Sequence, residues 1–208
     1  MGEKTKTGDE DNAGRRPPGR PRCERTRLAI LNSTLKFLEA KGNGFADLTI
    51  ERVAEDAGAG KATVYRWWPN KAALVADAFA TGVTQKLHFP DTGSVRQDMS
   101  QQMQQLVQIL RSRRGHILSV IVGAGQSDAT LMKAFRERFL KPRRAEAYMT
   151  LRRGIARGEL PEDLDLDFVL DALYGPIYMR FLVGHGSVTP EFVDQLCEQV
   201  LTRASCCK

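Results

Sequence analysis

The stretch LTIERVAEDAGAGKATVYRWWPNKAALV, residues 48–75, decides the fold. It holds two short segments with helical apolar spacing, 49–58 and 61–68, joined by the turn Gly58-Ala59-Gly60. Thr49 is a good helix N-cap, and the glycines are expected to end the first helix. Two short helices joined by a glycine-bearing turn are the layout of a helix-turn-helix.

The second segment divides its side chains between two faces. Val64 and Trp68 are four residues apart and are expected to face the core. The residues left to face outward are cationic, hydroxyl-bearing or aromatic: Lys61, Thr63, Tyr65, Arg66 and Trp67. Cations suit phosphates and guanine edges, hydroxyl groups reach phosphate oxygens, and aromatic rings pack on sugars. Lys71 follows at the start of the next predicted helix, where free backbone N–H groups favour an anion. The pattern predicts a DNA-binding surface.

The sequence on both sides is helical by its apolar period. Residues 24–41 carry leucines at helical spacing, and Asn70 is a plausible N-cap for the helix that follows it. Residues 117–122 are apolar all round and predict a buried helix, while Thr189 and Pro190 have the chemistry of a helix start. We found no credible strand, so we predict an all-α protein of about nine helices, with a three-helix head and a C-terminal bundle.

Charge separates the chain into unequal parts. The 208 residues have a net charge of +6, of which residues 1–74 contribute +4 and residues 75–208 contribute +2. Residues 13–27 alone hold six arginines and one acid, interleaved with prolines that keep a chain extended. We therefore expect a disordered basic arm at 1–22, a DNA-binding domain at 23–70, and a ligand-binding and dimerisation domain at 71–208.

Several classes of function are not expected. The four cysteines and three histidines have no zinc spacing, and no Ser/His/Asp set, carboxylate pair or phosphate loop is placed convincingly. We predict no catalytic residue, no metal and no cofactor, and hence no enzyme. No apolar run approaches the roughly 20 residues of a membrane span. The polar N-terminus has no secretory signal, which favours a reduced cytoplasmic protein with no membrane partner.

The stretch 48–75 closely resembles the DNA-binding domain of TetR/AcrR-family transcriptional regulators, and the resemblance extends over the preceding helix to about 50 residues. The run Gly58-x-x-Lys61-x-x-x-Tyr65-x-x-Trp68-x-x-Lys71 carries it. Residues 131–201 look like one of the regulatory domains of the family. The resemblance implies an all-helical homodimer with a DNA head and a ligand-binding body.

Carried over by residue, the resemblance implies three kinds of DNA contact. Thr49 and Lys71 contact phosphate, and Tyr65 and Trp67 contact phosphate and sugar. The residues that enter the major groove are Lys61, Ala62 and Thr63. Gly60 departs from the family, which often has a hydroxyl residue there. In the arm, Arg20 and Arg22 stand in a motif similar to a minor-groove hook built on Arg-Gly-Arg-Pro, although Pro18 replaces the first arginine.

The body offers candidate residues for a ligand and for a dimer interface. Aromatic, thioether and imidazole side chains suited to a pocket for a bulky apolar effector are Met103, His116, Phe135, Met149, Tyr174 and Tyr178. Apolar residues of the last two helices, expected to meet a twofold mate, are Phe181, Phe192, Leu196 and Val200.

Together these patterns predict a bacterial, nucleoid-associated repressor that binds a pseudo-palindromic operator on double-stranded DNA. A small-molecule effector in the body is expected to release it. Two alternatives stay open: control by oxidation of Cys197, Cys206 or Cys207, and an architectural DNA binder with no effector.

Overall fold

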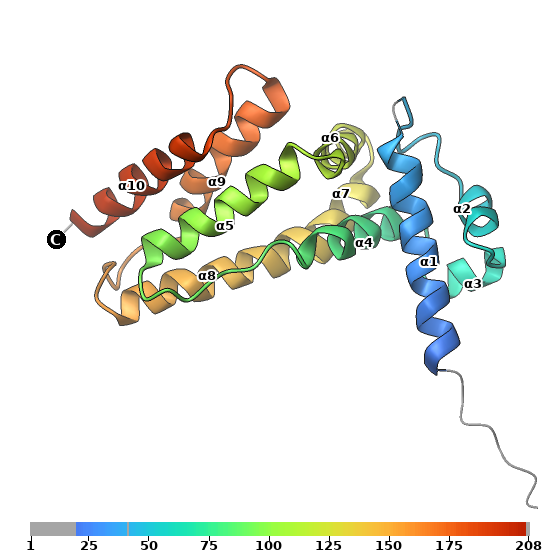
Figure 1. Cartoon of the computed structure of the whole chain (residues 1–208), viewed down its shortest axis with the longest axis horizontal. Helices are drawn as coiled ribbons and strands as arrows, with labels where there is room; N and C mark the ends of the chain where they lie inside the picture. Colours follow the sequence, from blue (N-terminus) through green and yellow to red (C-terminus); the bar gives the residue numbers. More distant parts are fainter. Residues whose placement is uncertain (1–19, 41, 207–208) are drawn as a thin grey trace, which may run out of the picture.

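The computed structural model describes residues 20–40 and 42–206. Within these ranges every regular element is helical, which confirms the predicted fold class. Figure 1 shows a head of three helices at one end and an elongated helical body that extends away from it. The C-terminal helix lies at the end of the body remote from the head.

The head is built from α1 (Arg20–Glu39), α2 (Ile50–Asp56) and α3 (Lys61–Trp67). Thr49 caps α2, as predicted, because its side chain accepts a hydrogen bond from the Arg52 N–H at 3.3 Å. Gly58 makes the turn after α2 at φ 61°, a left-handed conformation in which a side chain would be strained. The three helices bury one apolar core that includes Leu31, Leu38, Leu48, Val53, Val64 and Trp68.

Helix α1 begins earlier than the sequence predicted. It starts at Arg20, so residues 20–22 belong to the head rather than to an arm. Pro21 is the second residue of the helix, where its missing N–H costs no intrahelical hydrogen bond and its fixed φ suits the helix. Residues 1–19, the remainder of the predicted arm, lie outside the described residues.

Helix α4 (Lys71–Thr84) connects the head to the body. Asn70 caps it, as predicted, by accepting from the Ala73 N–H at 2.8 Å. The helix is buried along most of its length and packs on α1 of the head and on α6 (Arg113–Gly125) and α7 (Ala129–Phe135) of the body. Helix α4 therefore contacts both the head and the body.

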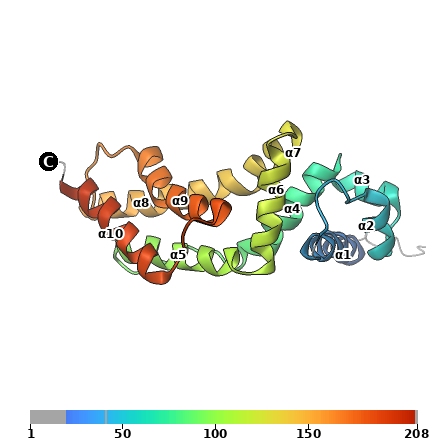
Figure 2. The same ribbon diagram turned by 90° about the horizontal axis from the view of Figure 1, so that it is seen from above.

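The body continues with α5 (Val95–Leu110), α8 (Lys141–Ala156), α9 (Leu166–Val183) and α10 (Pro190–Cys206). Between α7 and α8 the chain passes without a break through a π-helix, η1 (Arg136–Leu140). Thr189 caps α10, as predicted, by accepting from the Phe192 N–H at 3.2 Å. Figure 2 shows α9 and α10 side by side at the far end of the body, with α5 and α8 running back toward α4.

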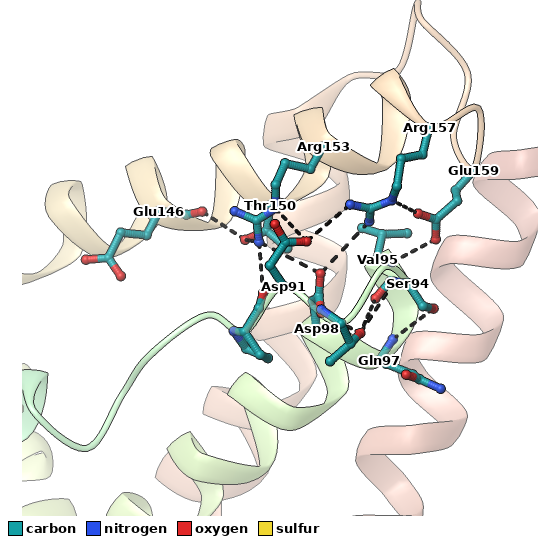
Figure 3. A network of polar contacts seen from close by, with 12 residues as sticks. Asp91, Ser94, Val95, Gln97, Asp98, Glu146, Thr150, Arg153, Arg157 and Glu159 are labelled. Atoms are coloured by element: carbon teal, nitrogen blue, oxygen red, sulfur yellow. Dashed lines mark hydrogen bonds and ion pairs between the residues drawn. The ribbon is translucent and has the colours of Figure 1, made fainter.

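A buried polar network holds the segment between α4 and α5 against α8 (Figure 3). Asp98 is fully buried, and its Oδ1 accepts from the N–H and the hydroxyl of Thr92 at 2.8 and 2.7 Å. From α8, the Arg153 Nη2 donates to the Pro90 carbonyl at 2.8 Å. Glu159 accepts from the Val95 N–H at 2.7 Å. Leu87 and Phe89, which precede these residues in the same segment, line a cavity described below.

No helix within 20–40 and 42–206 is long and apolar enough to cross a membrane.

Candidate DNA-binding surface and body cavity

Helix α3 presents the predicted side chains to solvent. Val64 and Trp68 are buried in the core, as the spacing predicted. The Tyr65 side chain is 45% exposed, a high value for an aromatic residue in the middle of a short helix. Lys61, Ala62 and Arg66 are also exposed, and Thr63 is half-buried. Lys61, Ala62, Tyr65 and Arg66 are therefore accessible from solvent on α3.

Lys61 of this surface is paired within the head. The Lys61 ammonium on α3 contacts the carboxylate of Glu51 on α2 and lies 5.8 Å from the centroid of the Tyr65 ring. Their hydrogen bond raises the pKa of Lys61 and lowers the pKa of Glu51. Both side chains are exposed, so water screens the pair and a phosphate could replace Glu51 at little cost.

Lys71 does not point to an outer phosphate site, in contrast to the expectation from the sequence. Its Nζ donates to three backbone carbonyls of the loop before α2, those of Phe45 (2.9 Å), Ala46 (3.3 Å) and Leu48 (3.1 Å). It also lies 4.5 Å from the centroid of the Phe45 ring. An ammonium has three protons, so all of its donors are used inside the head.

The adjacent tryptophans differ in their surroundings. The Trp67 side chain is half-buried, its indole N–H is shielded without a hydrogen-bond partner, and the Arg27 guanidinium lies 5.9 Å from its ring. The expected phosphate contact by Trp67 therefore needs a shift of the ring. The Trp68 indole N–H instead donates to the Oδ2 of Asp77 on α4 at 2.9 Å.

Asp77 joins the head to the body. Besides Trp68, which follows α3, it pairs with Arg27 of α1 at 3.1 Å and with Arg138 of η1 at 3.4 Å. Its side chain is mostly buried, with 18% exposed. Sequence reasoning missed this residue, because a lone acid on an apolar helix gives no signal of what it pairs with.

The body contains a cavity of about 120 Å³. It lies between α5, η1, α8 and α9, and the segment after α4 closes it. Its lining is mainly apolar and aromatic: Leu87, Phe89, Gln102, Leu106, Phe139, Leu140, Arg143, Arg144, Ala147, Tyr174 and Tyr178. The Tyr174 hydroxyl donates to the Gln102 Oε1 at 2.5 Å.

The structure brings together two of the six predicted pocket residues, Tyr174 and Tyr178. Met103 is fully buried with its sulfur 3.6 Å from the Cys197 Sγ, and Phe135 stacks with Phe139 in the core. Met149 is 61% exposed on α8. His116 is exposed near Glu39 at the end of α1, because the helix that was expected to be buried on all sides has one open face.

The predicted dimer residues flank a more exposed apolar face. Phe181, Phe192, Leu196 and Val200 are half-buried. Helix α9 has more exposed apolar side chains that the sequence reasoning did not select: Phe168 (70%), Met179 (56%), Leu182 (44%) and Val183 (61%). On the same helix, a side chain added at Gly175 would meet no atom within 4 Å. The far end of the body thus has an apolar face with no partner among the described residues.

The described residues contain no group of three or more potential metal ligands. Cys197 is the one cysteine whose side chain is described, and it is buried as a free thiol. Burial raises the pKa of this thiol to about 12.

Comparison with known proteins gives matches along most of the chain. A family model described as "Bacterial regulatory proteins, tetR family" matches residues 30–78, and one described as "Tetracyclin repressor-like, C-terminal domain" matches residues 89–200. The matches therefore include the body as well as the head.

Individual relatives also align over most of their length. The HTH-type transcriptional regulator YdeS of Bacillus subtilis is 42% identical over 178 residues, which are 86% of this chain and 89% of that one. The DNA-binding transcriptional repressor TetR of Mycobacteroides abscessus is 28% identical over 183 residues, with 86% and 94% covered. The crystal structure of the TetR family transcription regulator SCO0332 is similar with a TM-score of 0.75 at 36% identity, covering 86% of this chain and 97% of that one.

Proposed function

Because this chain belongs to the TetR family and is a DNA-binding transcriptional regulator, we propose that it is a homodimeric repressor. A small-molecule effector bound in the body releases it from a pseudo-palindromic operator. The observation that carries the DNA-binding role is the exposed face of α3, where Lys61, Tyr65 and Arg66 lie on one surface.

The face of α9 supports the dimer. Phe168, Met179 and Val183 are each more than half exposed, and a large contiguous apolar patch on a protein surface usually marks an interface. Two copies that pack α9 and α10 against each other form a four-helix interface. In such a dimer a twofold axis relates the two heads, which matches the two half-sites of a pseudo-palindromic operator.

The cavity supports the binding of an effector. One of its walls, η1, also contacts a residue that connects the body to the head. Phe139 and Leu140 of η1 line it, and Arg138 of the same π-helix pairs with Asp77. Single π-turns within helices are often found at functional sites. A ligand that favours another arrangement of η1 changes the anchor of Asp77, and through Trp68 the position of α3. The ligand shifts this equilibrium only by its difference in affinity for the two states.

The two alternatives have less support. A thiol that responds to oxidants needs thiolate character and access, and Cys197 is buried with a raised pKa. Cys207 and the side chain of Cys206 lie outside the part of the chain that the structure describes. An architectural binder without an effector needs no cavity in its body. We expect no enzymatic activity, and a repressor of this kind acts in the bacterial cytoplasm at the nucleoid.

A binding experiment tests the role of α3. Fragments of the DNA upstream of the protein's own gene are titrated in a fluorescence anisotropy assay, first to locate the operator. Tyr65→Ala and Arg66→Ala are expected to weaken operator binding about tenfold or more, since charged and stacking contacts to DNA are each worth about 1–3 kcal/mol. Arg152→Ala, on the exposed side of α8, is the matched control. Unchanged affinity in both α3 variants would contradict the proposal.

A further inference from the structure

The cavity of the body contains a cation that the fold does not satisfy. Arg143 of α8 lines it, and only 10% of this side chain is exposed. The Nη1 donates to the Oε2 of Glu146 at 2.7 Å. The Nε and the Nη2 are buried and have no hydrogen-bond partner. Buried N–H donors of a charged group are costly to leave unpaired, so a residue with a purely structural role is expected to satisfy them.

The two free donors are neighbours on the guanidinium. Its five N–H groups lie in one plane, and the Nε and Nη2 protons point in parallel from the same edge. This edge is one of those with which arginine binds a carboxylate through two parallel hydrogen bonds. Glu146 accepts at Nη1, on the opposite part of the group, so the side-on edge has no hydrogen-bond partner and has the geometry for a planar, two-oxygen anion.

The rest of the cavity suits the apolar part of such an anion. The Arg143 guanidinium lies 5.0 Å from the centroid of the Phe89 ring, and Leu106 and Phe139 supply further apolar wall. None of the described residues that line the cavity is acidic, and the Glu146 carboxylate, which pairs with Arg143 at Nη1, is not part of the lining. Burial raises the pKa of Tyr178 to about 12, which keeps its hydroxyl protonated and available as a donor.

The volume limits the size of the ligand. An apolar protein cavity of roughly 150 Å³ holds one benzene molecule. The cavity measures about 120 Å³, so a single ring or a chain of similar bulk is near its capacity without rearrangement of the walls.

We propose that the body binds a small aromatic carboxylate, held side-on by the Nε and Nη2 of Arg143 with its ring among Phe89, Leu106 and Phe139. The inference names the ligand class of the effector site and rests on the proposed function for the ligand's role as an effector. Binding itself is measured without DNA, so the two are tested separately.

The test is isothermal titration calorimetry of the full chain with benzoate, phenylacetate and cinnamate. The corresponding neutral amides are the comparison ligands. We expect at least one carboxylate to bind, and its amide to bind at least about tenfold more weakly, because a charged pair is lost. Equal affinity of acids and amides, or no binding by any of the three acids, would overturn the proposal.

Variants of α8 identify the side chain that binds the carboxylate. Arg143→Met is expected to lower carboxylate affinity about tenfold or more, and Arg143→Lys to restore only part of it, since lysine keeps the charge but lacks the fork. Arg152→Met, on the exposed face of α8, is the control and should bind as the natural chain does. Wild-type affinity in Arg143→Met would contradict the assignment.

Thermal unfolding separates this role from a structural one. Without ligand, Arg143→Met is expected to unfold at or above the temperature of the natural chain, because it removes two unpaired buried donors. A large loss of stability in both Arg143→Met and Arg143→Lys would assign Arg143 to the fold and overturn the proposal.

A final set of titrations measures operator binding in the presence of the carboxylates. If a carboxylate binds but leaves operator binding unchanged, the ligand class stands and the effector role in the proposed function fails. If no carboxylate binds while the operator is still bound, the ligand class fails and the DNA-binding role stands.

Discussion

The Lys71 ammonium is bound within the head at all three of its donors. It holds the carbonyls of Phe45, Ala46 and Leu48, and so fixes the loop that leads into α2. Its place in the sequence, at a helix start after an exposed α3, equally suits a phosphate contact. The local sequence does not separate these two roles, because the choice depends on carbonyls more than 20 residues away.

Loss of Lys71 is therefore expected to destabilise the head. Lys71→Met leaves three carbonyls without a charged donor, and we expect the free energy of unfolding to fall by about 1–3 kcal/mol. Urea unfolding followed by circular dichroism measures the change. Arg66→Met on exposed α3 is the control and should weaken operator binding with little loss of stability. A Lys71→Met protein as stable as the natural chain, but deficient in DNA binding, would restore the phosphate role.

Cys197 is expected to be unreactive in the folded protein. Burial raises its pKa to about 12 from the ordinary value of 9.0, so the folded state keeps the neutral thiol. The thiol thus adds stability that is fully present below pH 9 and is lost between pH 9 and 12, where the unfolded thiol ionises first. Alkylation at pH 8, followed by mass spectrometry, should modify Cys197 only after denaturant is added. Rapid modification of the folded chain would revive the thiol-controlled alternative.

At the scale of elements, Asp77 makes α4 the joint between head and body. It accepts from Trp68, pairs with Arg27 of α1, and pairs with Arg138 of η1. We expect Asp77→Ala to lower the free energy of unfolding by about 2 kcal/mol, less than for a fully buried pair because water reaches Arg27 and Arg138. Asp77→Asn should lower the free energy of unfolding by less, since its amide oxygen can still accept a hydrogen bond from the Trp68 indole.

Hydrogen exchange shows whether the contacts of Asp77 stabilise both the head and the body. In Asp77→Ala, amides of α3 and of η1 should lose protection together, whereas Glu162→Ala, in an exposed loop, should change neither. Loss of protection confined to the head would contradict a connection to the body.

The elements themselves were largely predictable from local chemistry. Thr49, Asn70 and Thr189 each cap the helix that the sequence assigned to them, because a cap depends only on a side chain and the next three residues. The paired Val64 and Trp68 predicted the buried side of α3 for the same reason. Helix ends were less certain, as the start of α1 at Arg20 illustrates.

The cavity was only partly predictable. Tyr174 and Tyr178 were selected for their chemistry and line it, whereas Met149 had the same chemistry and lies on the surface. Arg143 was not selected, because it stands among the cations of residues 141–144, and arginine and lysine are rarely buried. Its burial follows from the packing of α8 on α5 and α9, which is a tertiary property.

At the scale of the whole molecule, the far end of the body decides whether two heads act together. A second copy that covers the exposed face of α9 would bury Met179 and Val183. Met179→Lys should cost the single chain little, since this side chain is already 56% exposed, but it places an unpaired charge in a dimer interface. We expect light scattering after gel filtration to report a monomer, with operator affinity reduced about a hundredfold.

Gln108→Lys on the exposed face of α5 adds the same charge outside the expected interface and is the matched control. A Met179→Lys protein that remains dimeric would move the interface away from this face of α9.

The segment before α1 provides a separate test through the salt dependence of DNA binding. Residues 1–19 hold four cations and four acids, so their deletion leaves the net charge at +6. Any change in salt dependence then reports local contacts to phosphate rather than overall charge. If Arg15 and Arg16 each neutralise one phosphate, deletion of 1–19 should reduce the slope of log K against log salt by about two units, at about 0.9 per contact.

Deletion of 1–12 keeps both arginines and should leave the slope unchanged. Equal slopes for the two deletions would limit phosphate contact to Arg20 and the head beyond it.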